Sequence, residues 1–168
     1  DWIDGKWSHL DKNKDDYQRG KTAIAPETLA DVGKALTFAP DGFPMHKTVG
    51  RLIDAKKKMF DSGEGFDWAT GEAIAFGSLL TEGFPVRLAG QDSTRGTFSQ
   101  RHSGFVNQET EERFYPLNNI RAGQAHYEVI DSMLSEYAVL GFEYGYSMAE
   151  PNALTLWAAQ FGDFANGA

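Results

Sequence analysis

The chain has 168 residues and a formal net charge of −8, and its 41% hydrophobic content includes 12 Phe, 6 Tyr and 4 Trp. So many large apolar side chains exclude a disordered segment and are sufficient for one domain with a sizeable core. The negative charge argues against nucleic acid and anionic membrane surfaces as partners. The absence of cysteine excludes disulfides and thiolate chemistry.

The pattern of residues also argues against a membrane-spanning segment and against a metal centre within this fragment. The apolar stretch 137–142 is far shorter than the roughly 20 residues of a membrane-spanning helix, so we expect no membrane contact. No two of the four histidines have the short helical spacing that marks a zinc site, so we expect no metal bound within the chain. The sequence starts at Asp1 without an initiating Met or a signal pattern, which we interpret as the interior of a longer protein.

A polar arm and two helices are expected first. Residues 1–25 hold Trp2 and Trp7 in a Lys- and Asp-rich setting, which we interpret as an arm that docks on another surface through its aromatic side chains. A helix over residues 26–37 and a second helix with an apolar stripe over residues 49–60 follow, because apolar residues recur in both at helical spacing.

A third helix is expected after Asp67, a residue type that caps helix N-termini, and should end before Gly83. Its apolar stripe includes Glu72, where an unpaired charge would be costly. We therefore expect Glu72 to have a structural partner, with Arg87 as one candidate.

The middle of the chain predicts one buried strand and a polar connection. Residues 85–89 form a short apolar run between glycines, which is typical of a buried strand. This strand would deliver the polar loop 91–96, and loops at strand ends often carry function. Residues 99–125 are polar and irregular, so we expect no core element there.

The last third of the chain predicts an α/β fold. A strand at residues 127–130, a helix at 136–149 that is apolar on nearly every side, and a strand at 153–157 form a strand–helix–strand unit. This unit is typical of a mostly parallel sheet flanked by helices, and we expect its helix to be fully buried. Residues 161–168 resemble the opening of a further helix, so we expect a fold that is incomplete at its C-terminus.

Glu136 is the main candidate for chemistry. It lies at the expected strand-to-helix junction, and ligands of α/β sheets bind at the carboxyl ends of the strands. A purely structural alternative stays open from the residues alone, because Ser135 could cap the helix and Glu136 could be an acid favoured by the helix dipole. His102, in the polar segment, could donate a proton or bind an anion, but an isolated loop histidine is more often incidental.

Four blocks of sequence closely resemble one enzyme family. They are GEGFDWATGEAIAFGSLL (63–80), GFPVRLAGQDSTRGTFSQRHS (83–103), YEVIDSMLSEYAVLGFEYGYSMAEP (127–151) and LTLWAAQFGDFANGA (154–168). In this order they resemble the thiamine-diphosphate-dependent, decarboxylating first component of bacterial 2-oxoglutarate dehydrogenase complexes, over essentially the whole chain. DSTRGTFSQRH and FEYGYSMAEP separate this family from transketolases and from the pyruvate and branched-chain relatives. The chain is thereby predicted to be a fragment of such a protein.

The resemblance implies a fold and a domain division. Residues 63–168 would form the N-terminal part of a transketolase-like pyrimidine-binding domain, preceded by a docking arm and helical connector at residues 1–62. This domain would hold the aminopyrimidine half of thiamine diphosphate. The resemblance also implies Mg²⁺, bound with the diphosphate by a separate domain, since the sequence lacks the expected Gly-Asp-Gly motif with its following Asn.

The resemblance also implies roles for individual residues. Glu136, in the LSE motif, would contact the pyrimidine ring and favour the tautomer whose nitrogen removes the thiazolium proton. Leu134 and Phe164 would flank the ring, with Phe161 as the alternative stacking residue, and His102 would be a tentative local contact. Glu143, on the same helix, is expected to serve stability and not cofactor activation.

The implied reaction is the oxidative decarboxylation of 2-oxoglutarate in the tricarboxylic acid cycle, with transfer of the succinyl group to a lipoyl carrier. The implied partners are the dihydrolipoyl succinyltransferase component and a second copy of the protein in a homodimer. The location would be the bacterial cytoplasm, or the mitochondrial matrix in a eukaryote.

Ala158 departs from the family, which usually has Glu there. Two alternatives remain: another thiamine-diphosphate 2-oxoacid decarboxylase or ligase, and a non-catalytic interaction module. The fragment alone is not expected to be active.

Overall fold

The computed structural model describes residues 5–10 and 20–165. It contains four α-helices, five strands and two short 3₁₀ helices within this part of the chain. The helices are α1 (Pro26–Leu36), α2 (Lys47–Ser62), α3 (Trp68–Thr81) and α4 (Glu136–Ala149). The strands are β1 (Val86–Gly90), β2 (Phe105–Val106), β3 (Arg113–Phe114), β4 (Tyr127–Asp131) and β5 (Leu154–Ala158), and the 3₁₀ helices are η1 (Pro116–Asn118) and η2 (Phe161–Phe164).

Local signals set the ends of the first three helices as expected. Pro26 is the first residue of α1, where its missing N–H costs nothing. Gly63 follows α2 with a φ of 70°, a left-handed conformation that favours glycine. The Asp67 side chain accepts a hydrogen bond of 2.7 Å from the backbone N–H of Thr70 and so caps α3.

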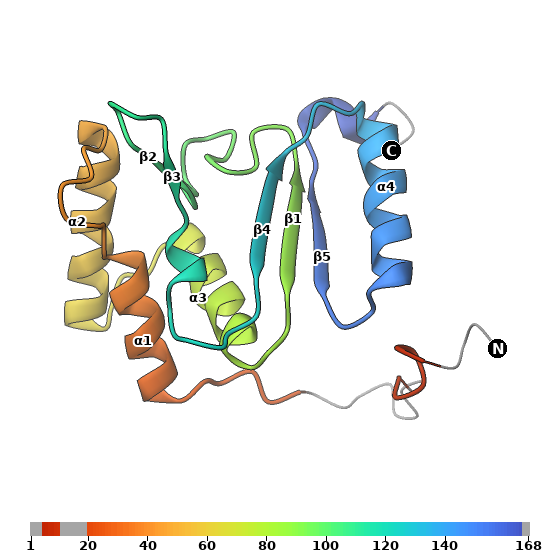
Figure 1. Ribbon diagram of the computed structural model, residues 1–168, viewed down its shortest axis with the longest axis horizontal. Helices are drawn as coiled ribbons and strands as arrows, with labels where there is room; N and C mark the ends of the chain where they lie inside the picture. The colour runs from red at the N-terminus through yellow and green to blue at the C-terminus, as the bar shows by residue number, and fades with distance from the viewer. Residues whose placement is uncertain (1–4, 11–19, 166–168) are drawn as a thin grey trace.

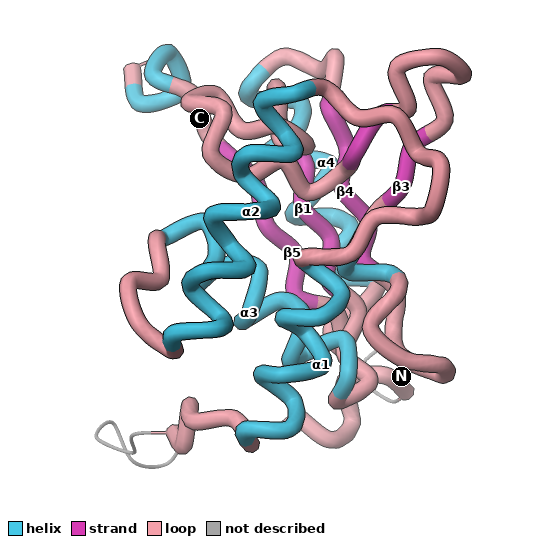
Figure 2. Tube along the Cα trace, turned by 90° about the vertical axis from the view of Figure 1, so that its left-hand side faces the viewer, coloured by secondary structure: helices cyan, strands magenta, loops and turns pink. Residues whose placement is uncertain are grey.

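The main sheet is parallel and lies between helices. Its strand order is β4–β1–β5, with Val86 paired to Tyr127 on one side and to Leu154 on the other. Figure 1 shows α4 beyond β5 on one side and α3, then α1 and α2, on the other. Figure 2, from the side of these three helices, shows them in front of the strands. The predicted α/β fold with a mostly parallel sheet flanked by helices is confirmed.

The core lies on the α3 side of the sheet. Strand residues alternate between faces, so Val86 and Leu88 of β1 point one way and Arg87 the other. Val86 and Leu88 join a buried cluster with Phe76 and Leu80 of α3. The other buried members of this cluster come from α1, η1 and β4, namely Val32, Leu36, Leu117 and Tyr127. The connector helix α1 therefore shares the core of the segment that follows it.

The prediction that residues 99–125 add nothing to the core is wrong. Phe105 is 3% exposed and Leu117 is 2% exposed, and Leu117 belongs to the central cluster. The segment also forms a small antiparallel pair in which Phe105 faces Phe114. Single apolar residues separated by polar ones show no periodicity, and so the sequence pattern did not reveal them.

The prediction that the helix at 136–149 is fully buried is also wrong. Only Val139 and Glu143 of α4 are buried, whereas Tyr137, Phe142 and Tyr144 are exposed. The physical reason is that α4 packs on one face of the sheet. Only the stripe of α4 that meets the sheet is therefore buried, although apolar residues occur all round the helix.

The N-terminal arm docks near the end of α4. The indole N–H of Trp7 donates a hydrogen bond of 2.9 Å to the backbone oxygen of Met148, and Lys6 forms an ion pair with Glu150. Trp2 lies outside the described residues. No helix in the described ranges is long and apolar enough to cross a membrane.

Candidate functional site

The loops after the three parallel strands meet at one edge of the sheet (Figure 1). The strands end at Gly90, Asp131 and Ala158. Two hydrogen bonds tie the loops after β1 and β4 together: the N–H of Ser132 donates to Gly90 O at 2.8 Å, and the N–H of Thr94 donates to Asp131 Oδ1 at 2.8 Å. This carboxyl edge is where parallel α/β sheets bind ligands.

Glu136 is the first residue of α4 and lies at this edge. It is half-buried and follows β4 after only four residues. Ser135 occupies the N-cap position, but its side chain makes no capping hydrogen bond. The helix dipole favours a carboxylate in the first turn. Glu136 therefore places a carboxyl group at the start of α4, at the carboxyl edge of the sheet.

Apolar side chains are also exposed in the segments that follow β4 and β5. Leu134, two residues before Glu136, is 45% exposed. Phe161, in the 3₁₀ helix after β5, is 72% exposed, and its ring lies edge-on to that of Phe98 with 6.1 Å between centroids. Phe164 is the last residue of η2, and its side chain lies outside the described part of the structure. Leu134 and Phe161 therefore expose apolar surface in the segments that follow β4 and β5.

The predicted partner of Glu72 is not Arg87 but Arg101. Arg101 Nε and Nη2 donate to the two carboxylate oxygens of Glu72 at 2.6 and 3.2 Å, and its Nη1 donates to Ser93 O at 2.8 Å. Arg87 lies on the opposite face of the sheet, where it pairs with Glu143. Because side chains alternate along a strand, Arg87 cannot reach α3.

His102 follows the anchored Arg101 in a left-handed backbone conformation, with a φ of 43°. Its imidazole is half-buried, and Nε2 is a buried nitrogen that lacks a hydrogen-bond partner among the described residues. Burial lowers the pKa of His102, and the positive charges of Lys56 and Arg95 lower it further. These effects favour the neutral form of the ring.

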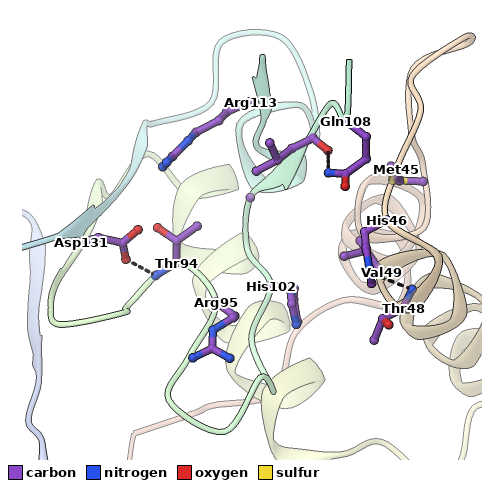
Figure 3. Close-up of a pocket in the computed structure, with 12 residues that line it drawn as sticks. Met45, His46, Thr48, Val49, Thr94, Arg95, His102, Gln108, Arg113 and Asp131 are labelled. Atoms are coloured by element: carbon purple, nitrogen blue, oxygen red, sulfur yellow. Dashed lines mark hydrogen bonds between the residues drawn. The ribbon is translucent and has the colours of Figure 1, made fainter. Parts of the chain in front are cut away.

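His102 lines a cavity of about 340 Å³ between α2 and the loop after β1 (Figure 3). Basic side chains from three segments line it: His46 before α2, Arg95 and His102 in the β1–β2 connection, and Arg113 in β3. Thr94 and Asp131 also line it, so the cavity reaches the carboxyl ends of β1 and β4. The structure thus brings His102 to the same edge of the sheet as Glu136.

Sequence reasoning missed three of these lining residues. His46 caps α2, with its Nδ1 accepting a hydrogen bond of 3.2 Å from the N–H of Thr48. Arg113 comes from the small β2–β3 pair, inside the segment interpreted as irregular. Of the three, only Arg95 was indicated by the sequence. It lies in the polar loop 91–96, which was expected at the end of a strand, where loops often carry function.

The residues at this edge suit an aromatic ring that carries hydrogen-bonding nitrogens. A carboxylate can hold or release a proton at a ring nitrogen, and exposed apolar side chains can cover the ring faces. No cluster of three metal-binding side chains occurs in residues 5–10 or 20–165.

Comparison with known proteins identifies the family of the chain. A family model described as "Transketolase, pyrimidine binding domain" matches residues 64–168. Three similar relatives are the "2-oxoglutarate dehydrogenase E1 component" of Brucella anthropi, of Brucella canis and of Brucella melitensis, with 58%, 57% and 56% identity, respectively. Each match covers 100% of this chain and 17% of the relative's length. The chain therefore belongs to the transketolase pyrimidine-binding domain family.

Proposed function

We propose that this chain is the pyrimidine-binding segment of a thiamine-diphosphate-dependent 2-oxoglutarate dehydrogenase. The observation that carries the proposal is the 58% identity, over the complete chain, with a protein of that name. The overall reaction would be oxidative decarboxylation of 2-oxoglutarate with succinyl transfer to a lipoyl group. Because the chain spans only 17% of such a relative, it would act as part of a longer protein and not alone.

Glu136 is proposed to activate the cofactor. Thiamine diphosphate, when bound, supplies the carbon that adds to the 2-oxo group and accepts the electron pair released by decarboxylation. Glu136 would hold a proton at the pyrimidine ring nitrogen and exchange it during catalysis. Its place in the first turn of α4 supports this role, because it sets the carboxyl group at the carboxyl edge of the sheet, where ligands of parallel α/β sheets bind.

Leu134 and Phe164 are proposed to cover the pyrimidine ring, with Phe161 as the alternative stacking residue. Leu134 and Phe161 are exposed at the carboxyl edge, where the ring would shield them from water. Phe164 lies in the same 3₁₀ helix as Phe161. Mg²⁺ would be held with the diphosphate by residues outside this segment.

The cavity beside His102 is proposed to receive 2-oxoglutarate. Its lining includes Arg95 and Arg113, whose guanidinium groups bind carboxylates, and His102 offers a nitrogen that can accept or donate a hydrogen bond. A substrate with two carboxylates suits this lining better than pyruvate, which has one.

The proposed partners are the dihydrolipoyl succinyltransferase component and a second copy of the protein. The proposed location is the bacterial cytoplasm, or the mitochondrial matrix in a eukaryote.

The test is turnover by the full-length protein with thiamine diphosphate and Mg²⁺. Oxidative decarboxylation should be much faster with 2-oxoglutarate than with pyruvate, and a lipoyl domain should be succinylated. Preference for pyruvate would assign the protein to another 2-oxoacid decarboxylase or ligase. No turnover of either substrate, together with no cofactor binding, would leave a non-catalytic interaction module.

A further inference from the structure

A buried ion cluster joins α4 to the sheet on the face opposite the core. Arg87 of β1 donates to Glu143 of α4 through Nε at 2.7 Å and through Nη2 at 2.9 Å. Both side chains are almost fully buried, at 9% and 5% exposed. A two-pronged pair of this kind fixes direction as well as distance, because the guanidinium and carboxylate must stay coplanar.

The remaining arm of the same guanidinium reaches a second strand. Arg87 Nη1 donates to Glu128 of β4 at 2.5 Å. The aromatic rings of Tyr146 and Phe142, both on α4, lie 4.6 and 5.4 Å from the guanidinium carbon. Arg87 therefore connects β1, β4 and α4 at one point, and its planar group is held by hydrogen bonds and by ring contacts.

Helix geometry relates this cluster to Glu136. Glu143 follows Glu136 by seven residues, which is about two helical turns and about 10 Å along the axis. The two carboxylates therefore lie on the same face of α4, and Val139 between them is buried against the sheet. Any rotation or slide of α4 that moves Glu143 moves Glu136 by a similar amount.

The cluster also flanks the loop that leads to Glu136. Glu128 lies three residues before the end of β4, and Glu143 lies two turns into α4. Residues 132–135, which include Leu134, therefore run between two segments that Arg87 holds together.

We propose that Arg87 is a positioning residue for cofactor activation, which holds α4 through Glu143 so that Glu136 meets the pyrimidine ring nitrogen. This inference rests on the proposed function. It departs from the expectation that Glu143 serves stability alone. A buried ion pair is a poor source of stability, because replacement by apolar residues of similar volume is often neutral or stabilising. What an apolar pair lacks is direction, and direction is what the placement of Glu136 requires.

The experiment uses the full-length enzyme and two exchange measurements. The first is deuterium exchange at the thiazolium carbon of bound thiamine diphosphate, and the second is backbone amide exchange of residues 134–140 in cofactor-free protein. Arg87→Lys keeps the charge but loses the two-pronged bond. The thiazolium exchange should fall by about 10- to 100-fold, as for a misplacement of about 1 Å, and the amides should exchange faster.

A control and a second variant separate positioning from stability. Arg121→Lys disturbs a bond from the Arg121 side chain to Thr81 O, next to the amino ends of the strands, so it should lower the melting temperature and leave thiazolium exchange unchanged. The double variant Arg87→Met with Glu143→Met should recover the melting temperature but not the exchange rate. This variant keeps the test open if Arg87→Lys does not fold.

Normal thiazolium exchange in folded Arg87→Lys would overturn the inference, as would recovery of exchange together with stability in the double variant. Glu136→Gln distinguishes the two levels of the argument. If it slows exchange and Arg87→Lys does not, only the positioning role fails. If Glu136→Gln leaves exchange unchanged, the proposed activation by Glu136 fails, and the positioning role fails with it.

Discussion

His102 combines a strained backbone with a buried ring. A φ of 43° is uncommon for a residue other than glycine, although histidine and asparagine tolerate it better than most residues. Arg101 anchors the segment by bonds to Glu72 and Ser93, so the surrounding structure imposes this conformation. Residues held in this way cluster at functional sites, in agreement with the position of His102 on the wall of the cavity.

The lowered pKa of His102 predicts a pH dependence of stability. Well above the ordinary pKa of 6.5 the His102 ring is neutral in both the folded and the unfolded protein, so its titration does not change the free energy of unfolding. As the pH falls below 6.5, the unfolded chain binds the proton first, so stability is lost down to the lower folded pKa. The melting temperature should therefore fall more between pH 7.5 and 5.5 in the wild type than in His102→Asn. Equal decreases in the two proteins would contradict this prediction.

The acidic residues show what sequence reasoning could and could not predict. The position of Glu72 on an apolar stripe correctly indicated a structural partner, but not which arginine supplies it. The place of Glu136 at a strand-to-helix junction was predictable because a strand end and a helix start are local signals, and its role in chemistry stays a prediction. The partner of Glu143 comes from a strand 56 residues earlier in the chain, and no local pattern carries such a pairing.

At the scale of elements, prediction succeeded where the cause is local. Pro26, Gly63 and Asp67 each act on the turn next to them, so their helix ends follow from residue type. It failed for the burial of Phe105 and Leu117, because that burial depends on which distant surfaces fold over them. For the same reason, the amount of α4 that is exposed did not follow from its composition.

The carboxyl end of β1 depends on one glycine. Gly90 has a φ of 146°, and a Cβ there would lie 2.6 Å from the backbone oxygen of Ala158 in β5. Gly90→Ala should therefore strain the backbone, at a cost of about 1–2 kcal/mol. The added Cβ should also push β1 and β5 apart, and this overpacking should cost about 1–3 kcal/mol. Gly83→Ala is the matched control, since it shares a positive φ of 93° but its Cβ meets no atom within 4 Å. Thermal melting should show the larger decrease for Gly90→Ala, and equal decreases would show that the close approach to β5 is relieved without cost.

At the scale of the whole molecule, the candidate site lies at the carboxyl edge of the parallel sheet, and apolar side chains are exposed there. Met133, Leu134 and Phe161, in the segments that follow β4 and β5, are exposed. The chain corresponds to 17% of relatives that match it along its entire length. The division into a connector at residues 1–62 and a pyrimidine-binding segment at 63–168 stays a prediction, and α1 shares the core of the second part.

The central claim is that Glu136 activates thiamine diphosphate, and Glu136→Gln in the full-length enzyme tests it most directly. Glutamine keeps the size of the side chain and a hydrogen bond, but it cannot hold and exchange a proton. Deuterium exchange at the thiazolium carbon of the bound cofactor should therefore slow by about 10²- to 10⁴-fold, with a much smaller change in cofactor affinity. Glu82→Gln, an exposed change at the C-terminal end of α3, should leave the exchange rate at the wild-type value. Exchange at the wild-type rate in Glu136→Gln would contradict the claim and return Glu136 to a structural role at the start of α4.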